Sequence, residues 1–250
     1  MSADTTGRRP VPDHDRAHSP VTLITGGSTG IGAATVHRLL KAGHRVAATG
    51  RSADRLAALA EQAAAPGQLL TLPGDATDPA AVAAAVAGTV ERFGRLDHAV
   101  ANAGFSTHDS IADGDPEGWR DMVLTNVLGP ALLVHAALPA LRESRGRIVL
   151  LGSVAGVKNT PGNMYSVTKW AVHALAENTR MQVTADGVGV SLIAPGRVET
   201  PFWDGHPSGA RPTGPALTAD AIAECIAWVL AQPEGTDVNQ VLVRPVGQPV

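Results

Sequence analysis

A tyrosine and a lysine stand four residues apart in the segment Tyr165-Ser-Val-Thr-Lys169. At this spacing on a helix, the two side chains lie on the same face. A free phenol loses its proton near pH ~10, and a cation a few ångströms away favours the phenolate and lowers the pKa. The pair could therefore exchange a proton with a reacting oxygen at neutral pH, although the same spacing also suits an exposed amphipathic turn.

A glycine-rich segment, Thr25-Gly-Gly-Ser-Thr-Gly-Ile-Gly32, follows the first predicted strand and leads into a predicted helix. Glycines let the backbone turn tightly and approach a pyrophosphate, and the free amides at the helix start attract its negative charge. The segment therefore predicts a dinucleotide site, although a tight turn without a ligand would use the same glycines. The residues expected to contact the cofactor are Gly26, Ser28, Thr29, Gly30, Ile31 and Gly32.

The end of the second predicted strand indicates which dinucleotide binds. Dinucleotide folds commonly place an acidic residue there to hold the ribose diol of NAD, but this chain has Gly50 followed by Arg51. Without a carboxylate to repel it, a 2′-phosphate can be accepted, and a guanidinium offers paired donors to its oxygens. We therefore predict NADP(H) as the cofactor. Arg51 is either the selecting residue or an ordinary surface arginine.

Two further segments follow predicted strands and are expected beside the cofactor. Asp75 could accept a hydrogen bond from the adenine amino group, with Ala76 as a backbone contact, or it could cap the next helix. Asn102, Ala103 and Gly104 place small residues where a bulky side chain would collide with the ribose.

These segments need a scaffold that brings strand ends together. Short apolar runs alternate with longer helical patterns, which is typical of strand-helix-strand units around a parallel sheet. The runs predict strands at 21–25, 45–49, 69–72, 97–100, 147–151, 188–193 and 240–243. The helical patterns span 31–42, 53–64, 79–93, 116–142, 162–185 and 218–231. We expect an α/β fold, a Rossmann-like doubly wound sheet of seven parallel strands flanked by helices, in a single domain at 20–250.

Two segments depart from this alternation. Residues 1–19 are polar and predict a disordered tail, in which the spacing of His14 and His18 is better explained by solvated side chains than by a metal site. Residues 200–217 are rich in proline and glycine, so they predict a loop. This loop is either a lid over the substrate or a disordered insertion.

Composition excludes several classes of partner. The 250 residues carry a formal net charge of -3, which gives no warrant for nucleic acid or an anionic membrane surface. There is neither a membrane-spanning run nor a secretory signal, so we expect the cytoplasm. The single cysteine, Cys225, excludes a disulfide framework within the chain and is expected to be a small buried side chain.

The glycine segment, Asn102-Ala-Gly104, Ser153, Tyr165-x-x-x-Lys169 and Pro195-Gly196, in this order, resemble the short-chain dehydrogenase/reductase family over about residues 20 to 247. The resemblance implies that Ser153 hydrogen-bonds a substrate carbonyl and that Tyr165 is the acid or base. It also implies that Lys169 lowers the tyrosine pKa and binds the nicotinamide ribose. Asn126 is expected to hold a water that links the lysine to solvent, or it satisfies a nearby backbone group instead. The segment that meets the nicotinamide contains Pro195, Gly196, Val198 and Thr200.

The predicted function is therefore an NADP(H)-dependent oxidoreductase that interconverts a ketone or aldehyde and an alcohol. A non-catalytic NADP-binding regulator or scaffold is the alternative, but it would not need Ser153, Tyr165 and Lys169 together. Sugar-nucleotide epimerase or dehydratase chemistry would need a substrate domain, and the span after Pro195 is too short for one.

The substrate pocket is expected from 155–164, including Asn159, Thr160 and Asn163, and from the 200–217 loop. It shows no cationic cluster for a carboxylate, so the substrate stays undetermined. Family resemblance also implies a homotetramer in which helices 116–142 and 162–185 pair between subunits. Apolar residues that would support this pairing are Leu124, Val127, Leu128, Leu132 and Leu133.

Overall fold

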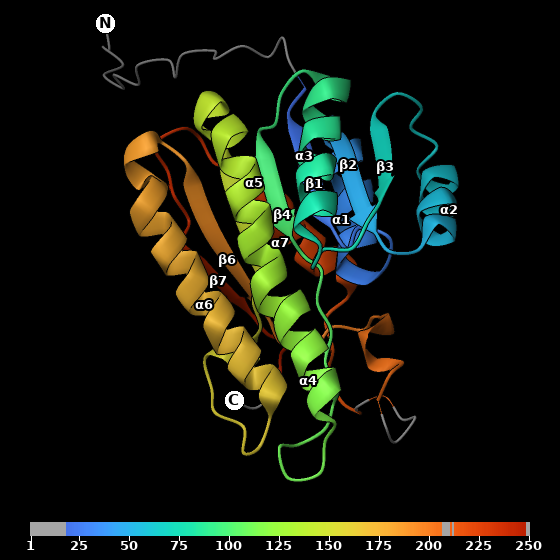
Figure 1. Ribbon diagram of the computed structural model, residues 1–250, viewed down its shortest axis with the longest axis vertical. Coiled ribbons are helices and arrows are strands. Elements are labelled where there is room, and N and C mark those ends of the chain that lie inside the picture. Colours follow the sequence, from blue (N-terminus) through green and yellow to red (C-terminus); the bar gives the residue numbers. More distant parts are fainter. Residues whose placement is uncertain (1–18, 207–210, 212, 249–250) are drawn as a thin grey trace, which may run out of the picture.

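The computed structural model describes residues 19–206, 211 and 213–248, which form one α/β unit around a seven-stranded parallel sheet (Figure 1). The predicted tail, Ser19 excepted, and part of the 200–217 loop lie outside these residues. The strand order is β3-β2-β1-β4-β5-β6-β7. The strands are β1 Val21–Thr25, β2 Arg45–Gly50, β3 Leu69–Pro73, β4 His98–Ala101, β5 Arg147–Leu151, β6 Gly189–Pro195 and β7 Gln240–Val243. The predicted doubly wound sheet is confirmed.

Helices cover both faces of the sheet. They are α1 Gly30–Lys41, α2 Ala53–Ala63, α3 Pro79–Phe93, α4 Pro116–Val123, α5 Gly129–Ser144, α6 Met164–Val183 and α7 Ala219–Leu230. Side chains of successive strand residues point to opposite faces. In β1, Leu23 packs with the layer of α3, α5 and α6, whereas Ile24 packs with α1, α2 and α7. The sheet is therefore buried on both sides, as its apolar strands predicted.

The direction in which the chain adds strands to the sheet reverses at β1, which lies between β2 and β4. The chain winds outward from β1 to β2 and β3, and then returns to continue with β4 on the other side. The turns that follow β1 and β4 diverge at this switch point, and ligands of open α/β sheets bind in the crevice formed at the carboxyl ends of such strands. The fold thus predicts where the site lies.

The predicted helix 116–142 is interrupted. Its middle, Leu124–Leu128, is a π-helical turn between α4 and α5, and the helix continues to Ser144. Single π turns inside α-helices are frequent at functional sites, and this one contains Asn126. The next predicted helix, 162–185, begins at Met164 because the Asn163 side chain caps it by accepting a hydrogen bond from the Ser166 amide at 2.7 Å.

The combined stretch Pro116–Ser144 has 29 residues and contains an 18-residue window with a mean hydropathy of 1.5, so by length and composition alone it could cross a membrane. Its inner face, however, is buried against the rest of the chain through Met122, Leu133 and Leu141. This is the packing of a core helix. Among the residues that the structure describes, no cluster of three or more His, Cys, Asp or Glu side chains could hold a metal ion.

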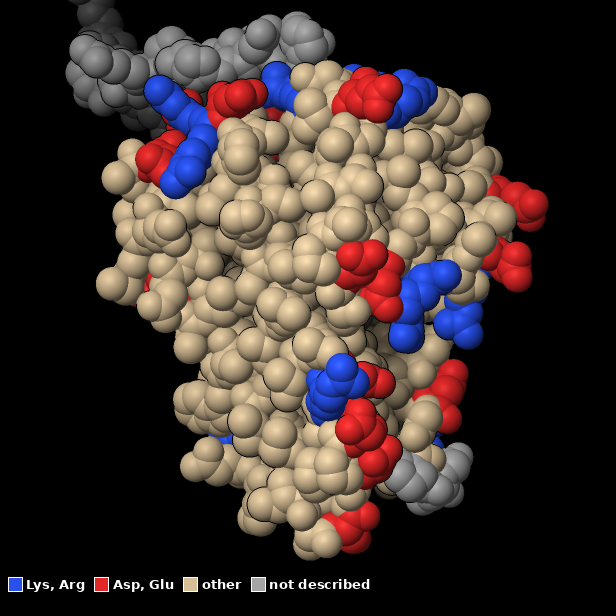
Figure 2. Space-filling model, in the orientation of Figure 1, with Lys and Arg blue, Asp and Glu red and all other residues tan. Residues whose placement is uncertain are grey.

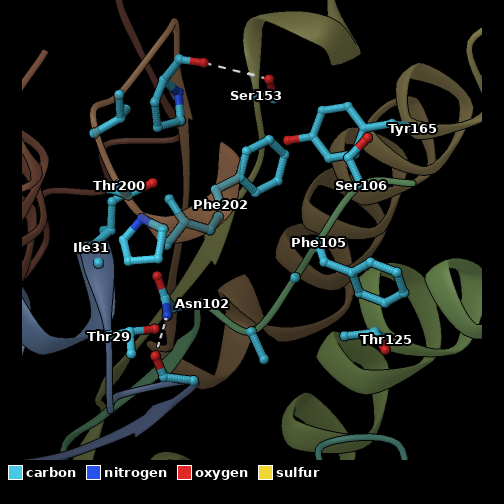
Figure 3. A pocket seen from close by; sticks show the side chains of 18 of the residues that line it. Thr29, Ile31, Asn102, Phe105, Ser106, Thr125, Ser153, Tyr165, Thr200 and Phe202 are labelled. Carbon is cyan, nitrogen blue, oxygen red and sulfur yellow. Dashed lines mark hydrogen bonds between the residues drawn. The ribbon is translucent and has the colours of Figure 1, made fainter. Parts of the chain in front are cut away.

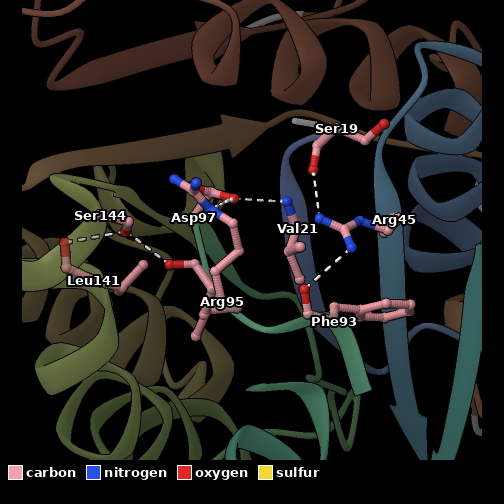
Figure 4. Close-up of polar contacts among 9 residues, drawn as sticks. Ser19, Val21, Arg45, Phe93, Arg95, Asp97, Leu141 and Ser144 are labelled. Carbon is pink, nitrogen blue, oxygen red and sulfur yellow. Dashed lines mark hydrogen bonds and ion pairs between the residues drawn. The ribbon is translucent and has the colours of Figure 1, made fainter. Parts of the chain in front are cut away.

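The amino ends of the strands are tied together on the side away from the crevice (Figure 4). The Asp97 carboxylate accepts a hydrogen bond from the Val21 amide at 2.8 Å and pairs with Arg95 at 2.6 Å. Arg45 donates to the backbone oxygens of Ser19 and Phe93. Asp97, the first residue of the predicted strand 97–100, therefore lies one residue before β4, and its role is structural.

Candidate active site

A cleft of about 1130 Å³ opens at the carboxyl ends of the strands, on both sides of the β1–β4 switch point. This volume suits a dinucleotide with a small substrate beside it. Residues from the ends of all strands except β7 line it. Of the residues predicted from the sequence as catalytic or cofactor-binding, the structure brings all but Gly32 and Asn126 to the wall of this one cleft.

The glycine segment forms a tight turn between β1 and α1. Gly26 and Gly30 have left-handed φ angles of 63° and 54°, and L-residues other than glycine rarely adopt this conformation. A Cβ on Gly32 would lie 2.1 Å from the Gly26 backbone oxygen, so Gly32 lets α1 pack against the turn without reaching the cleft. Of the side chains that the structure describes, none caps α1 at Thr29, and its first turn holds no acidic residue. Its amides are therefore available to an anion.

Asn102 holds this turn in place. Its Nδ2 donates to the backbone oxygens of Thr25 and Gly26 at 3.0 and 2.9 Å, and the Thr25 hydroxyl accepts from the amides of Asn102 and Ala103. A Cβ on Gly26 would lie 2.8 Å from the Ala103 Cα. The small residues after β4 are therefore needed first for the turn itself, a role that the sequence analysis did not assign.

The end of β2 presents cations and hydroxyls. Arg51 is exposed there, and Ser52 caps α2 by accepting from the Arg55 amide at 3.3 Å. Of the described residues that β2 and the start of α2 contribute to the cleft, none is acidic; they are Thr49, Gly50, Arg51, Ser52 and Arg55. The sequence analysis did not predict Arg55 as a cofactor-binding residue. Its spacing of four residues from Arg51 could have indicated that both arginines lie on the same side of the chain.

Asp75 lies in the cleft wall after β3. One of its carboxylate oxygens accepts from both the amide and the hydroxyl of Thr77 at 2.9 Å. The alternative interpretation of Asp75 as a helix cap is wrong, because Asp78 caps α3 by accepting from the Ala80 amide at 2.9 Å.

Tyr165, Ser153 and Lys169 meet at the other end of the cleft (Figure 3). The Tyr165 hydroxyl points into the cavity, toward Phe202, and Ser153 lies near enough to lower the pKa of this hydroxyl. The Ser153 hydroxyl also accepts from the Ala155 amide at 3.1 Å, and it lies 3.5 Å from the Pro195 backbone oxygen. Lys169 is 5% exposed, and its Nζ donates to the Leu151 backbone oxygen at 2.8 Å.

The structure corrects the expected pKa of the tyrosine. Burial raises the pKa of Tyr165 to about 12, against the lowering effect of the Ser153 hydrogen bond. Burial also lowers the pKa of Lys169 to about 8. The Lys169 Nζ lies 5.6 Å from the centre of the Tyr165 ring, and burial is the main cause of the pKa direction of each side chain. Tyr165 therefore holds its proton at neutral pH.

Asn126 is buried behind the cleft rather than exposed in it. Its Oδ1 accepts from the Phe105 amide at 3.0 Å, and its Nδ2 donates to the Phe105 oxygen at 2.9 Å and to the Thr168 hydroxyl at 3.1 Å. This is the backbone-satisfying role left open in the sequence analysis. A Cβ on Gly104 would lie 3.1 Å from the Asn126 Oδ1 and 3.7 Å from the Lys169 Nζ, so Gly104 separates the two.

The segment after β6 closes the cleft. Thr200 is 8% exposed, and a Cβ on Gly30 would lie 3.3 Å from the Thr200 Cβ. Gln248 accepts a hydrogen bond from the Arg197 amide at 2.9 Å.

From the predicted pocket segment 155–164, the cleft is lined by Ala155, Lys158, Thr160 and Asn163, but not by Asn159. The aromatic residues of the loop also line it, and so does His108, which the sequence analysis missed.

The doubly wound sheet, the glycine turn at its switch point and the Ser-Tyr-Lys set across the cleft define an oxidoreductase that uses a dinucleotide. The chain belongs to the short chain dehydrogenase family, whose pattern matches residues 20–209. It is 35% identical over 239 residues to serine 3-dehydrogenase of Rhizobium radiobacter, which covers 92% of this chain and 95% of that protein.

Two solved structures show the same fold. The alcohol dehydrogenase from the archaeon Thermococcus sibiricus, complexed with 5-hydroxy-NADP, has a TM-score of 0.85 and 29% identity, covering 93% of this chain and 99% of that chain. The closed form of serine dehydrogenase complexed with NADP+ has a TM-score of 0.86 and 29% identity, covering 92% and 96%. The predicted family and fold are thereby confirmed, and both structures agree with the predicted cofactor.

Proposed function

We propose that this protein is an NADP(H)-dependent oxidoreductase that interconverts a ketone or aldehyde and an alcohol, with Tyr165 as the acid or base. The observation that supports it most directly is the meeting of Tyr165, Ser153 and Lys169 in the same cleft as the glycine turn. One end of the cleft suits a pyrophosphate and the other suits a proton transfer. A non-catalytic NADP-binding protein would need only the first.

NADP(H), when bound, supplies or takes up the hydride at the carbonyl carbon. Ser153 and Tyr165 orient the substrate oxygen by hydrogen bonds. In reduction this oxygen becomes an alkoxide, which is a stronger base than a phenolate, so the proton passes to it from Tyr165. The raised pKa of Tyr165 suits this role, because the acid must still hold its proton before the transfer. Lys169 lies beside Tyr165, with its Nζ 5.6 Å from the ring centre.

The cofactor-binding residues support NADP over NAD. Arg51 and Arg55 offer two guanidinium groups where a carboxylate would hold an unphosphorylated ribose. Ser28 lies beside them, 3.0 Å from where a Cβ of Gly50 would be. We propose that these side chains bind the 2′-phosphate. The amides at the start of α1 bind the pyrophosphate, while Pro195, Gly196, Val198 and Thr200 face the nicotinamide.

We also propose that the subunits assemble as a homotetramer through α4, α5 and α6. Over the middle of α5 and α6 this face carries few charged side chains (Figure 2), and α6 exposes Val167, Trp170 and Met181 by 57, 45 and 64%. Leu128 at the π turn is 39% exposed, whereas Leu133, which was expected to contribute, is 1% exposed and packs on the sheet. Light scattering should give a mass of four chains of 25.6 kDa. A monomer would contradict this proposal.

The proposed function is tested by following NADPH absorbance with a panel of ketones and aldehydes. Turnover of at least one carbonyl, abolished in Tyr165→Phe, is the expected result. Tight NADPH binding without turnover of any carbonyl, or of any alcohol with NADP+, would support the regulatory or scaffold alternative instead.

A further inference from the structure

Four aromatic side chains gather in the wall of the cleft, from two loops far apart in the sequence. The His108 ring is stacked on Trp203 at 5.2 Å between centroids and meets Phe202 edge-on at 5.1 Å. Phe202 and Trp203 are perpendicular at 5.1 Å, and His206 lies 5.0 Å from His108. We refer to these four residues as the aromatic wall.

The aromatic wall reaches the reacting end of the cleft. The centroid of the Phe202 ring is 5.5 Å from that of Tyr165, and Figure 3 shows Phe202 directed toward the Tyr165 hydroxyl. A carbonyl that accepts a hydrogen bond from this hydroxyl must therefore place one of its substituents against or beside the Phe202 ring.

The wall is held in place before any substrate arrives. The His108 Nε2 lies 3.1 Å from the Phe202 backbone oxygen, which joins the two loops, and the Trp203 Nε1 donates to the Val198 oxygen at 2.9 Å. His108 itself has a left-handed φ of 56°. A non-glycine residue in this conformation is uncommon, and such outliers gather at functional sites.

Asp109 maintains this conformation of the loop. Its carboxylate accepts from the Thr107 hydroxyl at 2.5 Å, from the Trp119 Nε1 at 3.1 Å and from the Asp115 amide at 3.3 Å. These bonds tie the loop to α4. The ring of His108 is thus positioned by the residue that follows it, which favours a rigid contact surface.

The wall carries little charge near pH 7. Burial lowers the pKa of His108, which favours its neutral ring. The guanidinium of Arg197 donates to the backbone oxygens of Thr213 and Pro215, and Arg211 pairs with Asp204 at 2.5 Å. The aromatic wall itself therefore presents ring faces and edges rather than a charge that would pair with a carboxylate.

We propose that the substrate is an aryl ketone or aryl aldehyde, whose ring packs against Phe202, Trp203 and His108 while its carbonyl oxygen reaches Tyr165. Aromatic pairs gain attraction beyond the burial of their area when they are offset or edge-to-face. A flat ring beside the carbonyl makes such contacts with this wall, and a saturated ring of similar size does not. This inference rests on the proposed function and specifies its substrate class.

The test compares acetophenone with cyclohexyl methyl ketone under NADPH, because the two differ mainly in the aromaticity of one ring. The wild type should favour acetophenone in kcat/KM by at least about 5-fold, the size of one or two aromatic contacts. Phe202→Leu should bring this ratio close to one, while activity on the cyclohexyl ketone changes less. His108→Asn should also lower the ratio, because asparagine tolerates the left-handed backbone but has no ring.

Trp228→Leu is the matched control, since Trp228 on α7 is 54% exposed and lies outside the cleft. It should keep the wild-type ratio. Equal kcat/KM values for the two ketones in the wild type, a ratio unchanged in both wall variants, or a marked preference for L-serine with NADP+ would overturn the inference. The proposed function would survive these results. It would fall, together with the inference, if no carbonyl in a broad panel were reduced.

Discussion

The Nζ of Lys169 lies 5.6 Å from the ring centroid of Tyr165 and donates a hydrogen bond to the Leu151 oxygen at 2.8 Å. The ammonium is therefore anchored to the end of β5, beside the phenol ring. The same burial that raises the pKa of the tyrosine lowers that of the lysine. Burial therefore favours the neutral form of each group, and Tyr165 keeps its proton at neutral pH.

Replacing Tyr165 by phenylalanine should lower kcat by about 10²- to 10⁴-fold, the usual contribution of a positioned general acid. The affinity for NADPH should change less than threefold, because only the hydroxyl is removed. Steady-state kinetics and fluorescence titration measure the two effects. Retained turnover would exclude Tyr165 as the acid.

The rate of carbonyl reduction should depend on the charge of Lys169. Because the pKa of Lys169 is lowered to about 8, its cation is present below pH 8 and is lost as the pH rises above it. Reductive kcat should be level from pH 6 to 7 and decline about tenfold per pH unit well above 8. In Lys169→Arg the side chain stays charged, so the decline should move to higher pH even if kcat is reduced. A wild-type profile that stays level to pH 9.5 contradicts this dependence.

Replacing Arg51 by aspartate should reverse the cofactor preference. The guanidinium would no longer bind the 2′-phosphate, and the carboxylate would repel it, so kcat/KM with NADPH should drop by about 10- to 100-fold. The value with NADH should stay level or rise. Arg120→Ala, an exposed arginine on α4 outside the cleft, serves as the control and should change neither value. An unchanged preference for NADPH would show that Arg51 does not select the cofactor.

Acid should destabilise the fold through His98, at the amino ends of the strands. Burial is the main reason that the pKa of His98 is lowered to about 3; the facing groups His44 and Arg147 lower it further, and Asp97 raises it. Between pH 6.5 and this value, the unfolded chain takes up a proton that the folded chain does not. The free energy of unfolding should therefore fall by up to about 1.4 kcal/mol per pH unit from this residue.

Urea denaturation at pH 7, 6 and 5 measures this slope. His98→Leu removes the group that titrates and should flatten the slope, whatever its effect on stability at pH 7. His135→Gln, an exposed histidine on α5, should leave the slope as in the wild type. Equal slopes for His98→Leu and the wild type would assign the acid sensitivity to other groups.

The sequence by itself determined the elements of the fold and the identity of the groups that form the site. Strands and helices follow from periodicities of two and 3.6 residues, which are local properties of the chain. The glycine turn, the missing carboxylate after β2 and the Tyr165–Lys169 spacing are also local, and the structure brings these residues together at the switch point.

Only the tertiary structure decided the properties that depend on neighbours distant in the sequence. The π turn that carries Asn126 is anchored through the backbone of Phe105 and the hydroxyl of Thr168. His108 and Phe202 are 94 residues apart in the sequence, and no residue pattern in either loop predicts their contact. The pKa values of Tyr165 and Lys169 depart from the expected direction because desolvation depends on what packs around a group, and a linear sequence does not specify that packing.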